Sequence, residues 1–173
     1  MYRIFNPLSE RSLSGKLCNI LFVCTGNLCR SPMAEGILKN ILTEKHIVSI
    51  QVKSAGLMAM NGNPATLMAQ KASMCEGIDL SQHSAQFLSA ELVNDSDLIL
   101  VMERIHQQEI EAWFRQSQKK IFLLKSFGRE GVDEEIDDPI GGNQEMFELC
   151  FRLIRSEIYR ILPDLLEWCK NID

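Results

Sequence analysis

Apolar residues gather in short blocks that alternate with longer segments of mixed polarity. The short blocks predict buried β-strands, at Asn19–Val23, Ile47–Val52, Asp97–Met102 and Lys120–Leu124. Helical periodicity or composition predicts helices between and after them, at residues 31–45, 65–75, 104–116 and 143–168. The last helix is amphipathic, and one stripe of it holds Phe147, Phe151, Ile154, Ile158, Ile161 and Leu165.

Strands that alternate with helices predict an α/β fold. We expect three layers, α/β/α, around a four-stranded parallel sheet, in one domain over residues 18–173. Residues 1–17 are polar and aperiodic, so we interpret them as an N-terminal extension. Ligands of such sheets bind beyond the carboxyl ends of the strands. Residues 24–30 and 125–142 follow predicted strands at that end and are the candidate site loops.

Composition narrows the possible functions. The chain has 173 residues, 46% of them hydrophobic, and a formal net charge of -5, which disfavours a nucleic-acid partner. No apolar run approaches the roughly 20 residues that span a bilayer, and the N-terminus is a poor signal peptide. We therefore expect a cytoplasmic protein, without a membrane partner, whose six cysteines are reduced. No Cys/His cluster has zinc spacing, so neither a metal nor a cofactor is expected.

The first candidate loop combines residues that suit a bound phosphate. It reads Cys24-Thr25-Gly26-Asn27-Leu28-Cys29-Arg30-Ser31 and joins a buried strand to a helix that Ser31 is predicted to cap. Gly26 and Asn27 tolerate the positive φ angles that turn successive backbone N–H groups inward. The helix adds its positive N-terminal end, and Arg30 offers a planar fork for two phosphate oxygens.

Cys24 stands at the mouth of this loop. The N–H groups and the guanidinium that hold a phosphate would also stabilise a thiolate, which can attack phosphorus directly. Ser31 is placed to hydrogen-bond the sulfur when it leaves. Many cysteines are simply small buried residues, and we interpret the four outside this loop in that way. They are Cys18, Cys75, Cys150 and Cys169.

Several segments resemble the low-molecular-weight protein tyrosine phosphatase family. They are VCTGNLCRSPMAEG (23–36), SAG (54–56), GIDLSQHSA (77–85), DLILVMER (97–104) and DDP (137–139). They occur in the expected order over about residues 18–168. The resemblance implies a flavodoxin-like phosphatase fold and hydrolysis of phosphotyrosine through a phosphocysteine intermediate.

The resemblance also implies a role for each matching residue. Cys24 would be the nucleophile, Arg30 would bind the phosphate, and Asp138 before Pro139 would be the general acid. A hydrogen-bond network would fix the loop, through Asn27, Ser31, Ser54 and His83. A second loop cysteine captures the oxidised nucleophile in several members, and Cys29 could do so here.

Specificity within the family depends on the pocket walls. Phosphotyrosine-preferring members usually have aromatic walls, whereas this chain offers Met58, Met60 and Ile140. The Asp-Pro-x-Gly-Gly sequence at 138–142 resembles bacterial protein-arginine phosphatases, but those have threonine where this chain has Leu28. We therefore favour phosphotyrosine, with phosphoarginine as the alternative. The partner would be a phosphorylated protein, for instance a bacterial tyrosine kinase, and the enzyme a monomer.

Two hypotheses from other functional classes agree less well with the sequence. Thioredoxin-coupled arsenate reductases share the fold and the loop, but they need further cysteines, and residues 97–108 contain none. A phosphoprotein-binding module without activity would be expected to lack Cys24 or Asp138, and both are present.

Overall fold

The structure is a computed structural model that describes residues 17–172. Its centre is a parallel sheet of four strands in the order β2-β1-β3-β4. The strands are β1 (Cys18–Cys24), β2 (Ile50–Gly56), β3 (Leu98–Val101) and β4 (Ile121–Leu123). All four therefore end at the same edge, which confirms the predicted parallel sheet.

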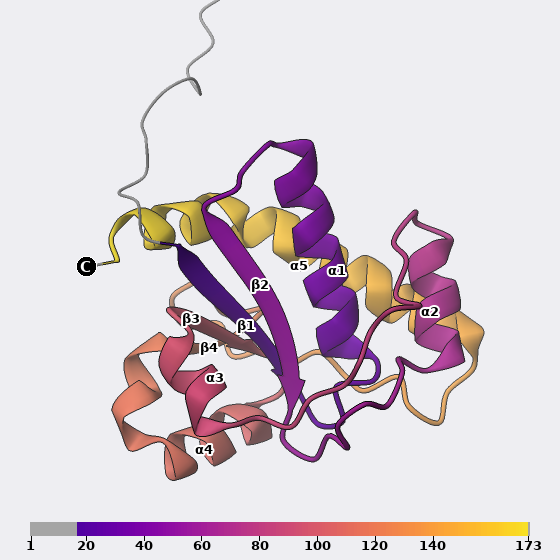
Figure 1. The fold of residues 1–173 in the computed structure, drawn as a ribbon, viewed down its shortest axis with the longest axis horizontal. Helices are drawn as coiled ribbons and strands as arrows, with labels where there is room; N and C mark the ends of the chain where they lie inside the picture. The colour runs from indigo at the N-terminus through magenta and orange to yellow at the C-terminus, as the bar shows by residue number, and fades with distance from the viewer. Residues whose placement is uncertain (1–16, 173) are drawn as a thin grey trace, which may run out of the picture.

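Helices cover both faces of this sheet (Figure 1). One face carries α1 (Arg30–Glu44), α2 (Leu67–Met74) and the long α5 (Gln144–Lys170). The other carries α3 (Ala90–Asp95) and α4 (Arg104–Trp113), which a 3₁₀ helix, η1 (Arg115–Lys120), connects to β4. The three-layer α/β/α architecture is confirmed.

The side chains of β1 alternate between two hydrophobic cores. Ile20 and Phe22 belong to the core under α1 and α5, whereas Leu21 and Val23 belong to the core under α3 and α4. All four are at most 1% exposed. Because both faces are covered, the strand needs no polar side and its sequence is a continuous apolar run.

Element boundaries differ from the predictions at several points. The second strand was predicted at 47–52 but lies at Ile50–Gly56, and α3 was not predicted. The prediction that Ser31 caps α1 is wrong, because the helix begins at Arg30 after Cys29. The Ser31 hydroxyl instead lies against Cys24. Of the predicted extension, residues 1–16 lie outside the described part of the chain.

The prediction that all six cysteines are reduced is also wrong in this structure. Cys18 at the start of β1 forms a disulfide with Cys169 at the end of α5, with Cα atoms 5.5 Å apart. The two residues are 151 positions apart in the sequence. Only the fold brings them together, so no local motif could reveal the pair.

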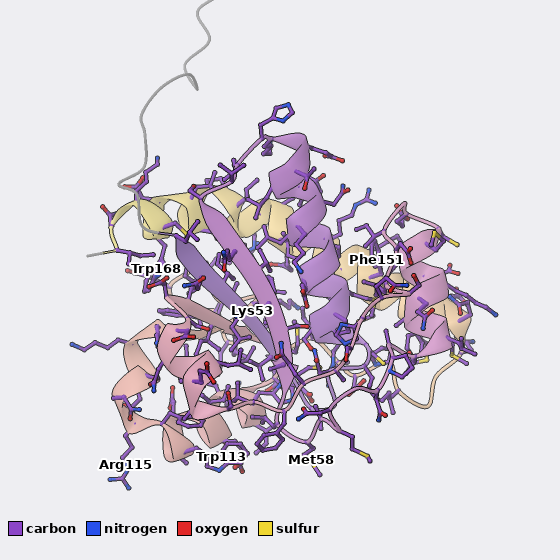
Figure 2. All side chains as sticks on the ribbon, viewed as in Figure 1. Lys53, Met58, Trp113, Arg115, Phe151 and Trp168 are labelled. Carbon is purple, nitrogen blue, oxygen red and sulfur yellow. A yellow bond between two sulfur atoms is a disulfide. The ribbon has the colours of Figure 1, made fainter. Side chains whose placement is uncertain are left out.

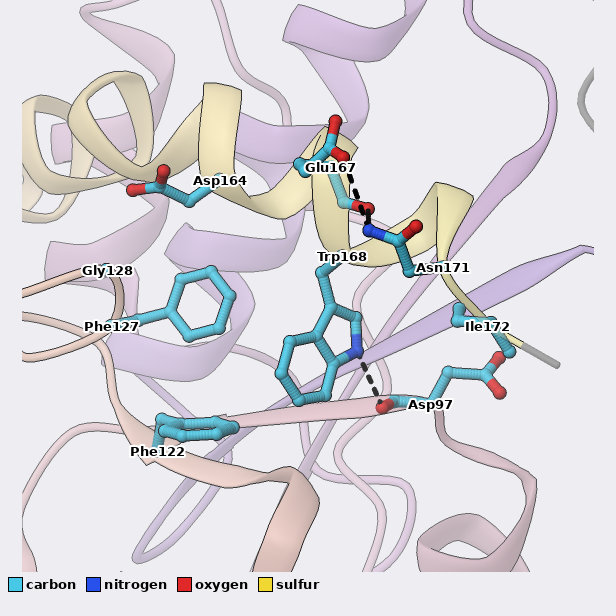
Figure 3. Close-up of a pocket in the computed structure, with 9 residues that line it drawn as sticks. All are labelled: Asp97, Phe122, Phe127, Gly128, Asp164, Glu167, Trp168, Asn171 and Ile172. Carbon is cyan, nitrogen blue, oxygen red and sulfur yellow. Dashed lines mark hydrogen bonds between the residues drawn. The ribbon is translucent and has the colours of Figure 1, made fainter.

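A pocket of about 650 Å³ is lined in part by Trp168 and Asn171, which lie on either side of Cys169 in the sequence. Its aromatic part consists of Phe122, Phe127 and Trp168, packed edge to face (Figure 3). In Figure 2, Trp168 lies near the start of β1, whereas Met58 lies beyond the end of β2. The pocket and the loop of residues 24–30 are thus at opposite ends of the sheet.

Among the helices of residues 17–172, none combines the length and the apolar composition of a membrane-spanning segment.

Candidate active site

The loop between β1 and α1 is anchored to the segment that follows β2. The amides of Leu57 and Met58 donate to the carbonyls of Cys24 and Thr25, at 3.1 and 2.8 Å. Asn27 has a φ of 55°, as its residue type allowed, whereas Gly26 has no positive φ. The predicted left-handed turn therefore occurs at one of its two candidate positions.

The Cys24 sulfur has two hydrogen-bond partners, Asn27 and Ser31. The backbone amide of Asn27 donates to the sulfur at 3.3 Å, and the Ser31 hydroxyl lies 2.9 Å from it. The side chain is 3% exposed and stands just before the N-terminal end of α1. The nucleophile candidate is therefore a buried sulfur that lies within hydrogen-bond distance of the first turn of α1.

Arg30 is almost fully buried and divides its donors among several acceptors. Its Nη1 donates to Glu103 at 2.6 Å and to the Ile136 carbonyl at 2.8 Å, and its Nη2 donates to Asp138. Burial alone would lower the pKa of this guanidinium, but the charges of Cys24, Asp138 and Glu103 raise it. Nε has no hydrogen-bond partner within the described residues. The Nε–Nη2 edge is therefore the part that an anion can engage.

Asp138 comes from the long loop after β4, the second candidate loop. One of its oxygens accepts from Arg30 and the other from the Ile140 amide, at 3.1 Å for the latter. Its side chain is 32% exposed, so it is still accessible to a substrate. The neighbouring Asp137 is exposed. The structure thus brings Asp138 to the loop, as predicted.

Asn27 is the centre of the buried polar network. Its side-chain nitrogen, Nδ2, donates to the hydroxyls of Ser31 and Ser54, both at 2.8 Å. Its side-chain oxygen accepts from the Gln86 amide at 2.9 Å, and its carbonyl lies 2.8 Å from Nε2 of His83. The four predicted network residues therefore meet, and Gln86 joins them.

Two carboxylates complete the surroundings of the loop, and neither was predicted. Glu35 accepts from the Ser54 hydroxyl at 2.5 Å. Glu103 accepts from Arg30, and the nearby His106 lies 2.9 Å from the Thr25 hydroxyl. Glu103 lies inside the DLILVMER segment, so it was part of a recognised motif without a chemical role. His106 follows that motif and had no signal of its own.

Cys29 is a buried thiol beside the site. Its sulfur lies 3.4 Å from the Thr66 hydroxyl, and burial raises the pKa of this thiol to about 11. Cys24 and Cys29 are both free in the structure. Cys29 is therefore a protonated thiol at neutral pH.

The predicted wall residues lie at the surface. Met58, Met60 and Ile140 are 75%, 71% and 57% exposed. The Met58 amide binds Thr25, and the Ile140 amide binds Asp138, so both border the site. Leu28 is partly buried and packs against the main core. The entrance is thus bordered by flexible and largely aliphatic side chains.

Comparison with known proteins identifies the family. The model of the low molecular weight phosphotyrosine protein phosphatase family matches residues 19–170. The chain belongs to this family. It is 37% identical to a protein-arginine-phosphatase of Geobacillus stearothermophilus, over 86% of this chain and 93% of that protein. It is 38% identical to a probable low molecular weight protein-tyrosine-phosphatase, EpsP, of Ralstonia solanacearum, over 83% of this chain and 93% of that protein.

Solved structures of the same family agree. The YwlE arginine phosphatase of Geobacillus stearothermophilus superposes with a TM-score of 0.80 at 34% identity, covering 90% of this chain and 98% of that one. The Erwinia amylovora tyrosine phosphatase AmsI gives a TM-score of 0.76 at 32% identity, covering 86% and 93%. Relatives named for either substrate are thus about equally similar to this chain.

Proposed function

We propose that this phosphatase hydrolyses phosphotyrosine in proteins, with Cys24 as the nucleophile. The observation that carries the proposal is the pairing of two features in one loop. The Cys24 sulfur accepts from the Asn27 backbone amide and lies 2.9 Å from the Ser31 hydroxyl, and the buried Arg30 has an Nε–H without a partner within residues 17–172. A phosphoryl group above the sulfur would supply the missing acceptor.

The first chemical step would transfer the phosphoryl group to the enzyme. The Cys24 thiolate attacks phosphorus, the S–P bond forms, and the bond between phosphorus and the tyrosine oxygen breaks. Asp138 donates a proton to the leaving oxygen, and Arg30 stabilises the charge on the phosphoryl oxygens. The product of this step is tyrosine with a phosphocysteine on the enzyme.

The second step would release inorganic phosphate. Asp138, now ionised, takes a proton from a water molecule that attacks the phosphocysteine. The S–P bond breaks, and the sulfur leaves as a thiolate. The Ser31 hydroxyl, 2.9 Å from Cys24, would stabilise that charge.

The contact between Arg30 and Asp138 would belong to the free enzyme. A dianion at the loop takes over the Nε–Nη2 edge of Arg30, which releases Asp138 from Nη2. The carboxyl group is then free to turn toward the leaving group. Glu103 and the Ile136 carbonyl occupy Nη1, so the guanidinium keeps its orientation.

Substrate choice is the finer part of the proposal. Leu28 is an apolar residue of the loop itself and offers no hydroxyl for a guanidino nitrogen, which favours an aryl ester. Protein-arginine phosphatase is the second candidate, because relatives with that name are as similar to the chain as the tyrosine phosphatases.

The test compares phosphotyrosine and phosphoarginine in peptides of otherwise identical sequence. We expect kcat/KM to be larger for phosphotyrosine, and Leu28→Thr to shift the ratio toward phosphoarginine. The Cys24→Ser variant is the control, and it should release no phosphate from either peptide. A wild-type preference for phosphoarginine would establish the second candidate.

The cellular setting belongs to the same proposal. A catalytic cysteine must stay reduced, and a bacterial cytoplasm would keep Cys24 so, while the Cys18–Cys169 bond lies away from the site. A tyrosine kinase is a suitable protein substrate there, and the enzyme would act as a monomer. The redox role of Cys29 stays a prediction. It predicts a Cys24–Cys29 disulfide after mild peroxide treatment, detectable by peptide mass spectrometry and absent in Cys29→Ser.

A further inference from the structure

His106 is a buried histidine that the proposed chemistry does not use. It lies on the first turn of α4 and is 1% exposed. The Glu103 amide donates to its Nδ1 at 3.1 Å, so Nδ1 is the acceptor and Nε2 carries the proton. Nε2 lies 2.9 Å from the Thr25 hydroxyl and 3.4 Å from a Glu103 carboxylate oxygen.

We propose that His106 is a positioning residue that joins Thr25 of the phosphate loop to Glu103, and through Glu103 to Arg30. The proposal rests on the proposed phosphatase function and deepens it. His106 touches neither the phosphate nor the leaving group in this scheme. It acts by fixing the two groups on either side of it.

Arg30 needs such a support because its orientation decides which edge faces the phosphate. Glu103 holds Nη1 at 2.6 Å with the same oxygen that lies near His106. The Glu103 side chain is 28% exposed, so packing alone does not fix it. The Nε2–H of His106 donates to the Thr25 hydroxyl, and the Glu103 carboxylate lies 3.4 Å from the same nitrogen. One ring therefore links the Thr25 side chain to the carboxylate that holds the Arg30 guanidinium.

The neutral ring suits this position. The charged groups that act on it are Arg30, Glu103, Asp138 and Glu135. Burial lowers the pKa of His106 to about 4, and Arg30 acts in the same direction. A protonated ring would compete with Arg30 for Glu103, whereas the neutral ring adds a donor without adding charge beside the guanidinium.

Two substitutions distinguish the roles of the two ring nitrogens of His106. In His106→Gln the side-chain amide can replace the Nε2 donor, but the acceptor for the Glu103 amide is lost. In His106→Asn the side-chain oxygen can replace the acceptor, but the side chain is too short to bring a donor to Thr25. A helix-capping role predicts that Asn is the milder change, whereas the positioning role predicts that Gln is.

The experiment measures kcat, KM and the melting temperature of both variants on a phosphotyrosine peptide. We expect His106→Asn to lower kcat at least about tenfold. His106→Gln should keep the larger part of kcat even if its melting temperature is the lower of the two. Thr25→Val should add little to His106→Asn, since both remove the same contact. The proposal is overturned if kcat follows the melting temperature in both variants, or if His106→Asn stays within about twofold of wild type.

A second readout does not need phosphatase activity. Inorganic phosphate should protect Cys24 from alkylation by iodoacetate, measured on the Cys24 peptide by mass spectrometry. His106→Asn should require about tenfold more phosphate than wild type for half-protection, and His106→Gln much less than that. If wild type hydrolyses no phosphotyrosine, the proposed function fails, and this order of protection still decides the role of His106. Equal protection in both variants would overturn it.

Discussion

At the scale of single residues, Arg30 shows why a charge is not equivalent to a guanidinium. Its Nη1 serves Glu103 and the Ile136 carbonyl, which leaves the Nε–Nη2 edge for the ligand. A lysine carries one point charge and cannot hold these acceptors and two phosphate oxygens in a fixed plane. We expect Arg30→Lys to lower kcat/KM by well over about tenfold, or about 1.4 kcal/mol. Steady-state kinetics on an aryl phosphate measures this, and a smaller loss would mean that charge alone suffices.

Asp138 gives the second prediction at this scale. A positioned general acid contributes about 10²–10⁴-fold to a step with a poor leaving group. Asp138→Asn should therefore slow phosphotyrosine hydrolysis in about that range, and slow hydrolysis of an activated aryl phosphate much less. Asp137→Asn is the control, because Asp137 is exposed while Asp138 contacts Arg30. The assignment would be wrong by one residue if Asp137→Asn were the damaging change.

The local part of the site could be predicted from the sequence because its residues are consecutive. The pattern from Cys24 to Ser31 indicated the proposed nucleophile and the proposed phosphate-binding arginine, and it allowed the left-handed Asn27 that the structure shows. Glu103 and His106 were not predicted because their roles depend on contacts across the sheet. A carboxylate before a helix and a histidine on its first turn are ordinary residues until the fold places them against Arg30 and Thr25.

At the scale of elements, the end of β2 supports the loop of residues 24–30 through the absence of a side chain. A Cβ on Gly56 would lie 2.7 Å from both the Asn27 amide nitrogen and the Thr25 carbonyl oxygen. Both are backbone atoms of the loop, so the loop itself would have to move. We expect Gly56→Ala to lower kcat/KM at least about tenfold, because displacements of about 1 Å can cost far more.

Gly26→Ala is the matched control for this change. A Cβ there meets only the Leu28 side chain, at 3.6 and 3.7 Å, which is ordinary contact. Because both variants add one methyl group to the same region, Gly26→Ala should lose much less kcat/KM. Similar losses in the two variants, measured with the same peptide, would argue that tight packing against β2 is not what holds the loop.

The predicted strands were correct where both faces of the strand are buried. The predicted limits of strands and helices were less exact elsewhere. The apolar run in β1 is buried on both faces, so its sequence pattern determined the strand. β2 alternates instead, with Gln51 and Lys53 exposed, which obscured its limits. α3 has six residues and one fully buried side chain, Val93, so it carries almost no periodic signal.

At the scale of the whole molecule, the Cys18–Cys169 disulfide joins the first strand to the last helix. A cross-link over 151 positions removes much of the conformational entropy of the unfolded chain. Replacing both cysteines with alanine should lower the free energy of unfolding by about 2–4 kcal/mol. Chemical denaturation without reductant measures this loss, and kcat should stay near wild type because the bond lies at the opposite end of the sheet.

A reductant provides the control for this prediction. It should destabilise the wild type toward the level of the double variant and leave the double variant unchanged. If reductant destabilises both proteins equally, the effect comes from another site, and the disulfide does not contribute in solution.

The buried histidine contributes to the response of the whole fold to acid. Burial lowers the pKa of His106 from 6.5 to about 4, so the unfolded chain binds a proton at pH 5 that the folded chain excludes. Its contribution to stability is therefore complete above about pH 6.5 and is lost as the pH falls toward 4. The full difference corresponds to about 3 kcal/mol.

Carboxylates also titrate below pH 5, so the comparison with His106→Gln isolates the contribution of this histidine. Urea denaturation at several pH values should show a smaller loss of stability in the variant between pH 6.5 and 4. Parallel curves would mean that His106 titrates normally in the folded protein, and that the neutral ring between Thr25 and Glu103 is not maintained.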